Sequence, residues 1–335
     1  MTSTDLNRPI CVLGLGLIGG SLLRDLAGRN HPAYGYDRST ASVRAAGREG
    51  FDTSSDLTGI LSRAEEEGAL IVLATPMPAI AGLLDALGEH APSCGFTDVV
   101  SVKTEISQLV HQRGMDNRYV GGHPMAGTAN SGWTASHKGL FTRAAWVVTY
   151  DHAENADREW IELWSDVVRL VATVGAEAVP ARVAHHDAAV ARISHLVHVF
   201  AETLAVVGDN GGTLAQSLAA SSFRDSTRVA STQPALVQAM CETNAPAVVS
   251  ALDEAMEILA ETREALSGPE PDLSGLAEAG YSARERFEAR HGARRESVSP
   301  IKISSRPLLR LQPGTKGWIR HLEHAESLGA RIEIF

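Results

Sequence analysis

The sequence predicts an α/β N-terminal domain built on a doubly wound parallel sheet, then an all-α domain and a short C-terminal β–α–β appendage. Three observations support this fold class. Short apolar runs alternate with helical stretches in the first half, alanine-rich helical segments fill the second half, and prolines punctuate residues 296–335. Continuous apolar runs separated by helices are typical of parallel strands that are buried on both faces.

The predicted parallel strands are apolar runs that end on a glycine or a polar residue. The first run ends at Gly14 and precedes a helix over 17–26. The runs cover residues 9–14, 33–37, 69–74, 97–102 and 145–150. In such sheets, ligands bind beyond the carboxyl ends of the strands, so we look for the site in the residues that follow these runs.

The pattern becomes helical after about residue 155. The expected elements are a helix over 160–175, a strand over 177–180, one extended helix over 181–207, and helices over 234–242, 245–266 and 275–291. The tail predicts a helix over 318–328 and a strand over 330–334. We expect domains at 1–180, 181–295 and 296–335. An alanine-rich helical half exposes apolar surface that a second copy can cover, which predicts a homodimer.

Composition excludes several classes of protein. The 335 residues hold 30 Lys and Arg against 40 Asp and Glu, a net charge of −10, which argues against a nucleic-acid partner. No run of eighteen uncharged apolar residues predicts a membrane span, and the start lacks the pattern of a secretory signal. Cys11, Cys94 and Cys241 show no metal-site or disulfide spacing. We expect a soluble cytoplasmic protein without a bound metal.

A glycine motif follows the first strand and opens the first helix. Its residues are Gly14-Leu15-Gly16-Leu17-Ile18-Gly19, which match G-x-G-x-x-G. The first glycine permits the tight turn, the second lets the backbone approach a pyrophosphate, and the third lets helix and strand pack closely. The free N–H groups of the helix N-terminus then face the phosphates. This context predicts a dinucleotide site.

An acidic residue at the end of the second strand indicates which dinucleotide binds. The Asp37 carboxylate can accept hydrogen bonds from both ribose hydroxyls of the adenosine and would repel a 2′-phosphate. Arg38, the next residue, can contact a 2′-phosphate instead. We expect NAD rather than NADP. Thr75 and Pro76, which follow the third predicted strand, complete the expected cofactor site.

A second group of polar residues follows the later strands. Ser101 and a histidine held between glycines and a proline, His123, lie where the nicotinamide end of the cofactor is expected. Histidine suits proton transfer near neutral pH. These residues are therefore candidates for catalysis.

Together these stretches resemble the prephenate/arogenate dehydrogenase family of tyrosine biosynthesis. The resemblance covers about residues 8–290. It is carried by the glycine motif and by residues 101–103, 122–127, 186–187, 194–198 and 223–228. It implies a Rossmann-type N-terminal domain, a helical domain that forms an intertwined dimer, and oxidative decarboxylation of a cyclohexadienyl substrate with NAD.

The resemblance also implies residue roles. His123 would accept the proton of the ring hydroxyl as hydride departs, and Ser101 would bind the same hydroxyl or orient the imidazole. Arg228 would hold the side-chain carboxylate bidentately. The remaining substrate contacts are His195, on the long helix; Asp225, which would hold Arg228 in place; and Arg224, which would reach the ring carboxylate of a substrate in the partner subunit.

Alternatives remain open at this point. Residues 219–222 and 234–237 and Ala191 differ from the pattern of many relatives, so arogenate or an amino-substituted prephenate can replace prephenate as substrate. A β-hydroxyacid dehydrogenase relies on a lysine in its helical domain, and none occurs between Lys138 and Lys302. A non-catalytic NAD-binding sensor would need neither His123 nor Arg228.

Overall fold

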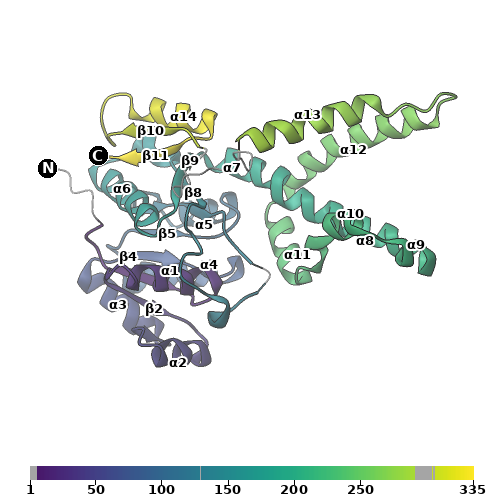
Figure 1. The fold of residues 1–335 in the computed structure, drawn as a ribbon. Coiled ribbons are helices and arrows are strands. Elements are labelled where there is room, and N and C mark those ends of the chain that lie inside the picture. Colours follow the sequence, from purple (N-terminus) through teal and green to yellow (C-terminus); the bar gives the residue numbers. More distant parts are fainter. Residues whose placement is uncertain (1–5, 129, 291–303, 305) are drawn as a thin grey trace, which may run out of the picture. The chain divides into compact units, whose positions relative to one another are not determined.

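The computed structural model describes residues 6–128, 130–290, 304 and 306–335 (Figure 1). The chain forms two compact units. Unit 1 comprises Met1–Asp187 together with Leu308–Phe335, and unit 2 comprises Ala188–Pro307.

Unit 1 is built on a six-stranded parallel sheet, as the sequence predicts. Its strands are β1 (Ile10–Leu13), β2 (Ala33–Tyr36), β3 (Thr53–Ser54), β4 (Leu70–Leu73), β5 (Phe96–Asp98) and β6 (Tyr119–Val120), in the order β3-β2-β1-β4-β5-β6. Leu13 is in register with Tyr36 on one side and Leu73 on the other. The residues after these three strands therefore lie at one edge of the sheet.

Helices cover both faces of this sheet. They are α1 (Leu17–Ala27), α2 (Thr40–Arg48), α3 (Leu57–Glu67), α4 (Ile80–His90), α5 (Thr104–His111) and α6 (Arg158–Thr173). Alternate residues of β1 belong to different cores: Ile10 and Val12 pack with α1 and α6, while Cys11 and Leu13 pack with α3, α4 and α5. This two-sided burial explains why the strand is apolar throughout.

The run at 145–150 was expected in the parallel sheet, and this expectation is wrong. It forms β8 (Ala145–Thr149) in a separate sheet, between β7 (Gly122–Pro124), which is antiparallel to it, and β9 (Glu177–Ala181), which is parallel. Both sheets share the core around α6, so both produce the same apolar pattern. The run at 97–102 is also shorter than expected, because β5 ends at Asp98.

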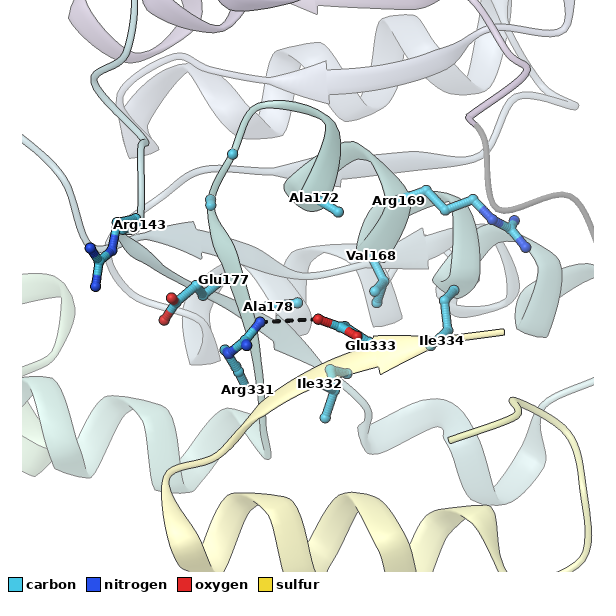
Figure 2. Close-up of a pocket in the computed structure, with 12 residues that line it drawn as sticks. Arg143, Val168, Arg169, Ala172, Glu177, Ala178, Arg331, Ile332, Glu333 and Ile334 are labelled. Carbon is cyan, nitrogen blue, oxygen red and sulfur yellow. Dashed lines mark hydrogen bonds and ion pairs between the residues drawn. The ribbon is translucent and has the colours of Figure 1, made fainter. Parts of the chain in front are cut away.

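The C-terminal appendage is a β–α–β element that packs within unit 1. Strands β10 (Leu308–Leu311) and β11 (Arg331–Ile334) are parallel, and α14 (Trp318–Leu328) joins them. The Trp318 ring meets the Trp164 ring of α6 edge-on, with 5.5 Å between centroids. Figure 2 shows β11 near Glu177 and Ala178 of β9, beside a cavity of about 430 Å³.

Unit 2 is helical. Its elements are the end of α7 (Val183–Val190), a π-helical turn (Ala191–His195), α8 (Leu196–Asn210), α9 (Gly212–Leu218), α10 (Ser221–Ser226), a 3₁₀ turn (Arg228–Ser231), α11 (Pro234–Thr243), α12 (Ala245–Ser267) and α13 (Ser274–Arg290). The single regular helix expected over 181–207 therefore contains a π turn. Residue 291, the expected end of the last helix, lies outside the described residues.

One helix in the described part of the chain, Val183–Asn210, is long and apolar enough to cross a membrane by composition. It also carries ionisable residues, including Asp187, Arg192 and Glu202. Large apolar side chains on it, such as Ile193 and Val207, are more than half exposed in the single chain. A surface of this kind is typical of a helix that another subunit covers.

Candidate active site

The glycine motif forms the turn between β1 and α1. Gly14 has a φ of +111°, and a Cβ there would lie 2.5 Å from the Ala74 carbonyl oxygen. A Cβ on Gly19 would lie 1.9 Å from the Gly14 oxygen, so both positions require glycine. Gly16, by contrast, faces open space, and no side chain caps the helix that starts after it. The turn therefore has the close packing and the open backbone that a pyrophosphate needs.

Asp37 is held by backbone donors at the end of β2. Its Oδ2 accepts the Leu15 N–H at 2.8 Å, and its Oδ1 accepts the Ser39 N–H at 2.7 Å. These bonds fix the carboxylate beside the glycine turn, while the Leu15 side chain is fully buried. Arg38 is exposed next to it.

A cavity of about 480 Å³ lies at this edge of the sheet. Its lining comes from the turn after β1, the end of β2 and the residues after β4: Gly14, Gly16, Tyr36, Asp37, Arg38, Ala74, Thr75, Pro76, Pro78 and Ala79. The structure thus brings together six of the residues that the sequence assigns to the cofactor. Leu17 and Ile18, which open α1, are half-buried, and Gly19 packs beneath the turn.

His123 lies on β7, in register with Val147 of β8. The preceding residue must be glycine, because a Cβ on Gly122 would lie 2.6 Å from the Asp98 carbonyl oxygen. This close approach places the half-buried His123 ring near the carboxyl end of β5. Ser101 is half-buried in the loop that follows β5.

A chain of hydrogen bonds runs behind the His123 ring. Nδ1 of His123 lies 2.8 Å from Nε2 of His186, and Nδ1 of His186 lies 2.7 Å from Oδ1 of Asp187. An ionised carboxylate only accepts, so the neutral His186 ring donates from Nδ1 and its Nε2 is an acceptor. His123 then donates from Nδ1, which leaves its Nε2 as the basic atom. The arrangement follows the logic of a catalytic triad, in which the base is oriented by a third group.

Asp187 belongs to α7, and its ionised carboxylate is buried against the start of α5. Its Oδ1 also accepts the Lys103 N–H at 2.8 Å, and its Oδ2 accepts the Thr104 N–H at 2.7 Å. Burial opposes ionisation, but the hydrogen bonds from His186, Thr104 and Lys103 outweigh it and lower the pKa of Asp187 to about 2. The His186 ring is 3% exposed, so water does not compete for these bonds.

A second buried network supports the same loop. The Lys103 ammonium pairs with Asp98 Oδ1, and the Tyr119 hydroxyl donates to Asp98 Oδ2 at 2.7 Å. Burial lowers the pKa of Lys103, although Asp98 opposes this, and burial next to Asp98 raises the pKa of Tyr119. The Gly122 N–H also donates to Asp98 Oδ2, at 3.3 Å. The network thus links the loop of Lys103 to the strand that carries His123.

In unit 2, the structure places His195 in the π turn. Its ring is buried, and Nδ1 lies 3.2 Å from Nδ2 of Asn244. π turns within α-helices are frequent at functional sites. The His195 ring thus contacts the turn between α11 and α12.

Arg224, Asp225 and Arg228 are exposed in the single chain. The expected pairing of Asp225 with Arg228 is not formed: among the described residues, no ion pair joins them. The reason is local. Helix α10 ends at Ser226, and Arg228 begins a separate 3₁₀ turn, so the two residues do not share one helical face.

Sequence reasoning missed four residues of the site: Asp98, Lys103, His186 and Asp187. His186 belongs to a stretch that carries the family resemblance but was given no role there, and its ring contacts His123 directly. A signal was present in the adjacent His186-Asp187 pair. However, the partner of His186 lies 63 residues earlier, and sequence spacing does not reveal such a contact.

Two family models match this chain in succession. Residues 20–179 match "prephenate dehydrogenase, nucleotide-binding domain", and residues 182–279 match "prephenate dehydrogenase, dimerization domain". The structure is similar to the crystal structure of a candidate prephenate dehydrogenase from Corynebacterium glutamicum. The two chains are 58% identical, with a TM-score of 0.93 and coverage of 99% of this chain and 100% of that one.

Two relatives extend the comparison. A cyclohexadienyl dehydrogenase from Zymomonas mobilis is 31% identical over 284 residues, which are 79% of this chain and 90% of the relative. A prephenate dehydrogenase from Bacillus subtilis is 32% identical over 260 residues, 73% of this chain. This chain spans 66% of the Bacillus protein and 61% of a prephenate dehydrogenase from Lactococcus lactis. Because the two models together match most of its length, this chain belongs to the prephenate dehydrogenase family.

Proposed function

We propose that this protein catalyses the NAD-dependent oxidative decarboxylation of prephenate to 4-hydroxyphenylpyruvate, a step of tyrosine biosynthesis, in the cytoplasm. The observation that carries the proposal is the hydrogen-bond chain from His123 through His186 to Asp187, because it orients an imidazole as a base. The same unit holds the dinucleotide cavity, and family membership supports the reaction class.

In this proposal, His123 Nε2 accepts the proton of the ring hydroxyl, and Ser101 binds the same hydroxyl. NAD, held by the glycine turn and Asp37, would supply the hydride acceptor for the carbon that bears this hydroxyl. The ring carboxylate then leaves as carbon dioxide, its bonding electrons make the ring aromatic, and the phenolate oxygen takes a proton back from His123. The His186–Asp187 pair stabilises the imidazolium during this step, as an anion behind a ring does in a triad.

Substrate binding is assigned to unit 2. Arg228 would hold the side-chain carboxylate through its planar guanidinium, with Asp225 close in sequence, and His195 would contact the substrate from the π turn. Arg224 favours the more anionic of the two common substrates. Prephenate carries two uncompensated carboxylates, whereas arogenate also carries an ammonium group. Arogenate is the alternative, since a relative is described as a cyclohexadienyl dehydrogenase.

The cofactor is assigned as NAD through Asp37. A fixed carboxylate beside the glycine turn suits ribose hydroxyls and repels a 2′-phosphate. Gly14, Gly16 and Gly19 shape the turn, Leu15, Leu17 and Ile18 present its backbone, and Arg38, Thr75 and Pro76 line the cavity.

The active protein is proposed to be a homodimer, with residues 1–180 binding the dinucleotide and 181–295 forming the subunit contact. Unit 2 exposes many large apolar side chains, including Leu214 and Leu218, which are more than two-thirds exposed. Burying these side chains against a second copy would stabilise the dimer by about 25 cal/mol per Å² of apolar surface.

The test follows NADH absorbance with prephenate and with arogenate in turn, using NAD and then NADP. We expect kcat/KM to be higher for prephenate with NAD. His123→Asn should lower kcat by about 10²–10⁴-fold, because the amide keeps the size of the ring but not its basicity. The control is His111→Asn, because His111 is exposed and pairs with Asp116; this variant should leave kcat unchanged. A ratio that favours arogenate would overturn the substrate, and near-normal turnover by His123→Asn would overturn the base.

A further inference from the structure

One side chain of the C-terminal appendage, Glu326, contacts the start of helix α7. Glu326 of α14 accepts the Arg182 backbone N–H at 2.9 Å through Oε1, and the same oxygen lies 3.0 Å from His185 Nδ1. Its Oε2 accepts the Tyr150 hydroxyl. Burial and this bond raise the pKa of Tyr150, so the phenol remains a donor. The Arg182 N–H, the His185 ring and the Tyr150 hydroxyl thus all contact the Glu326 carboxylate of the appendage.

The start of α7 is close in sequence to His186, a member of the hydrogen-bond chain behind His123. The Arg182 carbonyl accepts the His186 N–H at 2.9 Å, so the residue whose N–H Glu326 holds is one helical turn before His186. The Val183 N–H donates to Asp151 Oδ2 at 2.9 Å. The first N–H groups of a helix have no partner within it, and carboxylates that accept from them fix where the helix starts.

Helix α14 is itself firmly held. Trp318, Leu322 and Ala325 are buried in the core that contains α6. At the surface, the Arg182 guanidinium pairs with Glu323 of α14 at 2.9 Å and with Glu154 at 3.0 Å. Because α14 is anchored, a carboxylate on it can set the position of the α7 turn.

We propose that the appendage positions residues of the active site, and that it does so through Glu326. Glu326 fixes the start of α7, this fixes the His186 ring, and His186 in turn fixes the tautomer and orientation of His123. The inference rests on the proposed function for its catalytic readout. It assigns a role to residues 308–335, which lie outside both family models.

The geometry leaves little tolerance. The bond between His123 and His186 is 2.8 Å long, and a hydrogen bond is largely lost when its atoms separate by a further ångström. A loosened His186 would also stabilise the His123 imidazolium less, which would lower the apparent pKa of the base. A misplacement of this size can cost about 10²-fold in rate.

The test compares Glu326→Ala with Glu323→Ala. Both remove a carboxylate from the same helix, but Glu323 pairs with the Arg182 guanidinium, whereas Glu326 accepts from the Arg182 backbone N–H. Glu326→Ala should lower kcat about 10-fold, with KM for NAD within about two-fold, and shift the acidic limb of the pH profile about 0.5–1 unit lower. Glu323→Ala should change none of these. Glu326→Gln keeps an acceptor for the Arg182 N–H and should restore most of kcat.

A second readout does not depend on turnover. In hydrogen exchange of the full-length protein, backbone amides of 182–187 should exchange about 10-fold faster in Glu326→Ala than in Glu323→Ala. If wild type turns over no cyclohexadienyl substrate, the proposed function fails, while the exchange result still tests the link between α14 and α7.

Equal exchange in the two variants, or an unshifted acidic limb in Glu326→Ala, would overturn the proposal. If Glu326→Ala does not fold, Tyr150→Phe replaces it. That variant removes the donor to Glu326 Oε2 without touching α7, and it should shift both readouts in the same directions by smaller amounts. No shift in either readout would again overturn the proposal.

Discussion

Asp187→Asn probes the hydrogen-bond chain behind His123 with a change of only one atom. The carboxylate accepts on both oxygens: Oδ1 faces His186 and the Lys103 N–H, and Oδ2 faces the Thr104 N–H. An amide has one acceptor. In one orientation its NH₂ group faces the Thr104 N–H, so that two donors oppose each other. In the other, the NH₂ group faces His186, whose Nδ1 must then accept and whose Nε2 must donate. In the second case His123 holds its proton on Nε2 and can no longer act as the base.

The size of the effect follows from the pKa of Asp187. Its fall from 3.8 to about 2 favours the ionised form by about 2 kcal/mol. The variant loses this contribution, so its free energy of unfolding at pH 7 should fall by about 2 kcal/mol. Because the folded pKa lies below the unfolded one, the contribution is complete above about pH 5 and lost as the pH falls toward about 2. The two proteins should therefore converge in stability in acid. We expect kcat to fall by about 10²–10⁴-fold, as for loss of a positioned base.

The assay combines NADH absorbance with urea unfolding over this pH range. Asp166→Asn is the matched control, because Asp166 is a buried aspartate of unit 1 that pairs with Arg8 and Arg169, away from His123. It should lower stability with kcat unchanged. If Asp187→Asn lost stability but kept kcat within about three-fold of wild type, the carboxylate would hold only the fold, and the reasoning on tautomers would be refuted.

Three further predictions concern the cofactor, the buried charges and the assembly. Asp37→Ser should raise kcat/KM for NADP relative to NAD by about 10-fold or more, and an unchanged preference would remove Asp37 as the ribose ligand. Lys103→Met leaves Asp98 buried without its cation and should lower the free energy of unfolding by about 3–5 kcal/mol in urea titrations; a loss below about 1 kcal/mol would contradict the burial argument. Light scattering at micromolar concentration should give twice the chain mass of 35.6 kDa, and the mass of one chain would count against the dimer.

The cofactor turn could be predicted from sequence because its determinants are local. Gly14, Gly16 and Gly19 act within six residues, and Asp37 follows from the strand order of a doubly wound sheet. Helix periodicity likewise placed α6, α12 and α14 within a few residues of their bounds. Each of these elements depends on its own side chains and on the face it buries.

The hydrogen-bond partners that orient His123 could not be predicted, because they come from segments that are distant in sequence. His186 meets His123 across 63 residues, and Lys103 meets Asp187 across 84. The assignment of 145–150 to the parallel sheet failed for a related reason: burial on both faces gives the same apolar pattern in either sheet. The pairing of Asp225 with Arg228 assumed one helix, and the break after Ser226 removes it.

The division of the chain has a consequence for the order in which the molecule is made. Unit 1 is interrupted after Asp187 and resumes at Leu308, so unit 2 is an insertion within it. On the ribosome, the whole of unit 2 is synthesised before Trp318 can cover Trp164 and before Glu326 can reach the start of α7. A nascent chain can therefore hold a complete glycine turn and a complete helical half while the start of α7 still lacks its contact with Glu326. The proposed activity would then be acquired only after α14 has been synthesised.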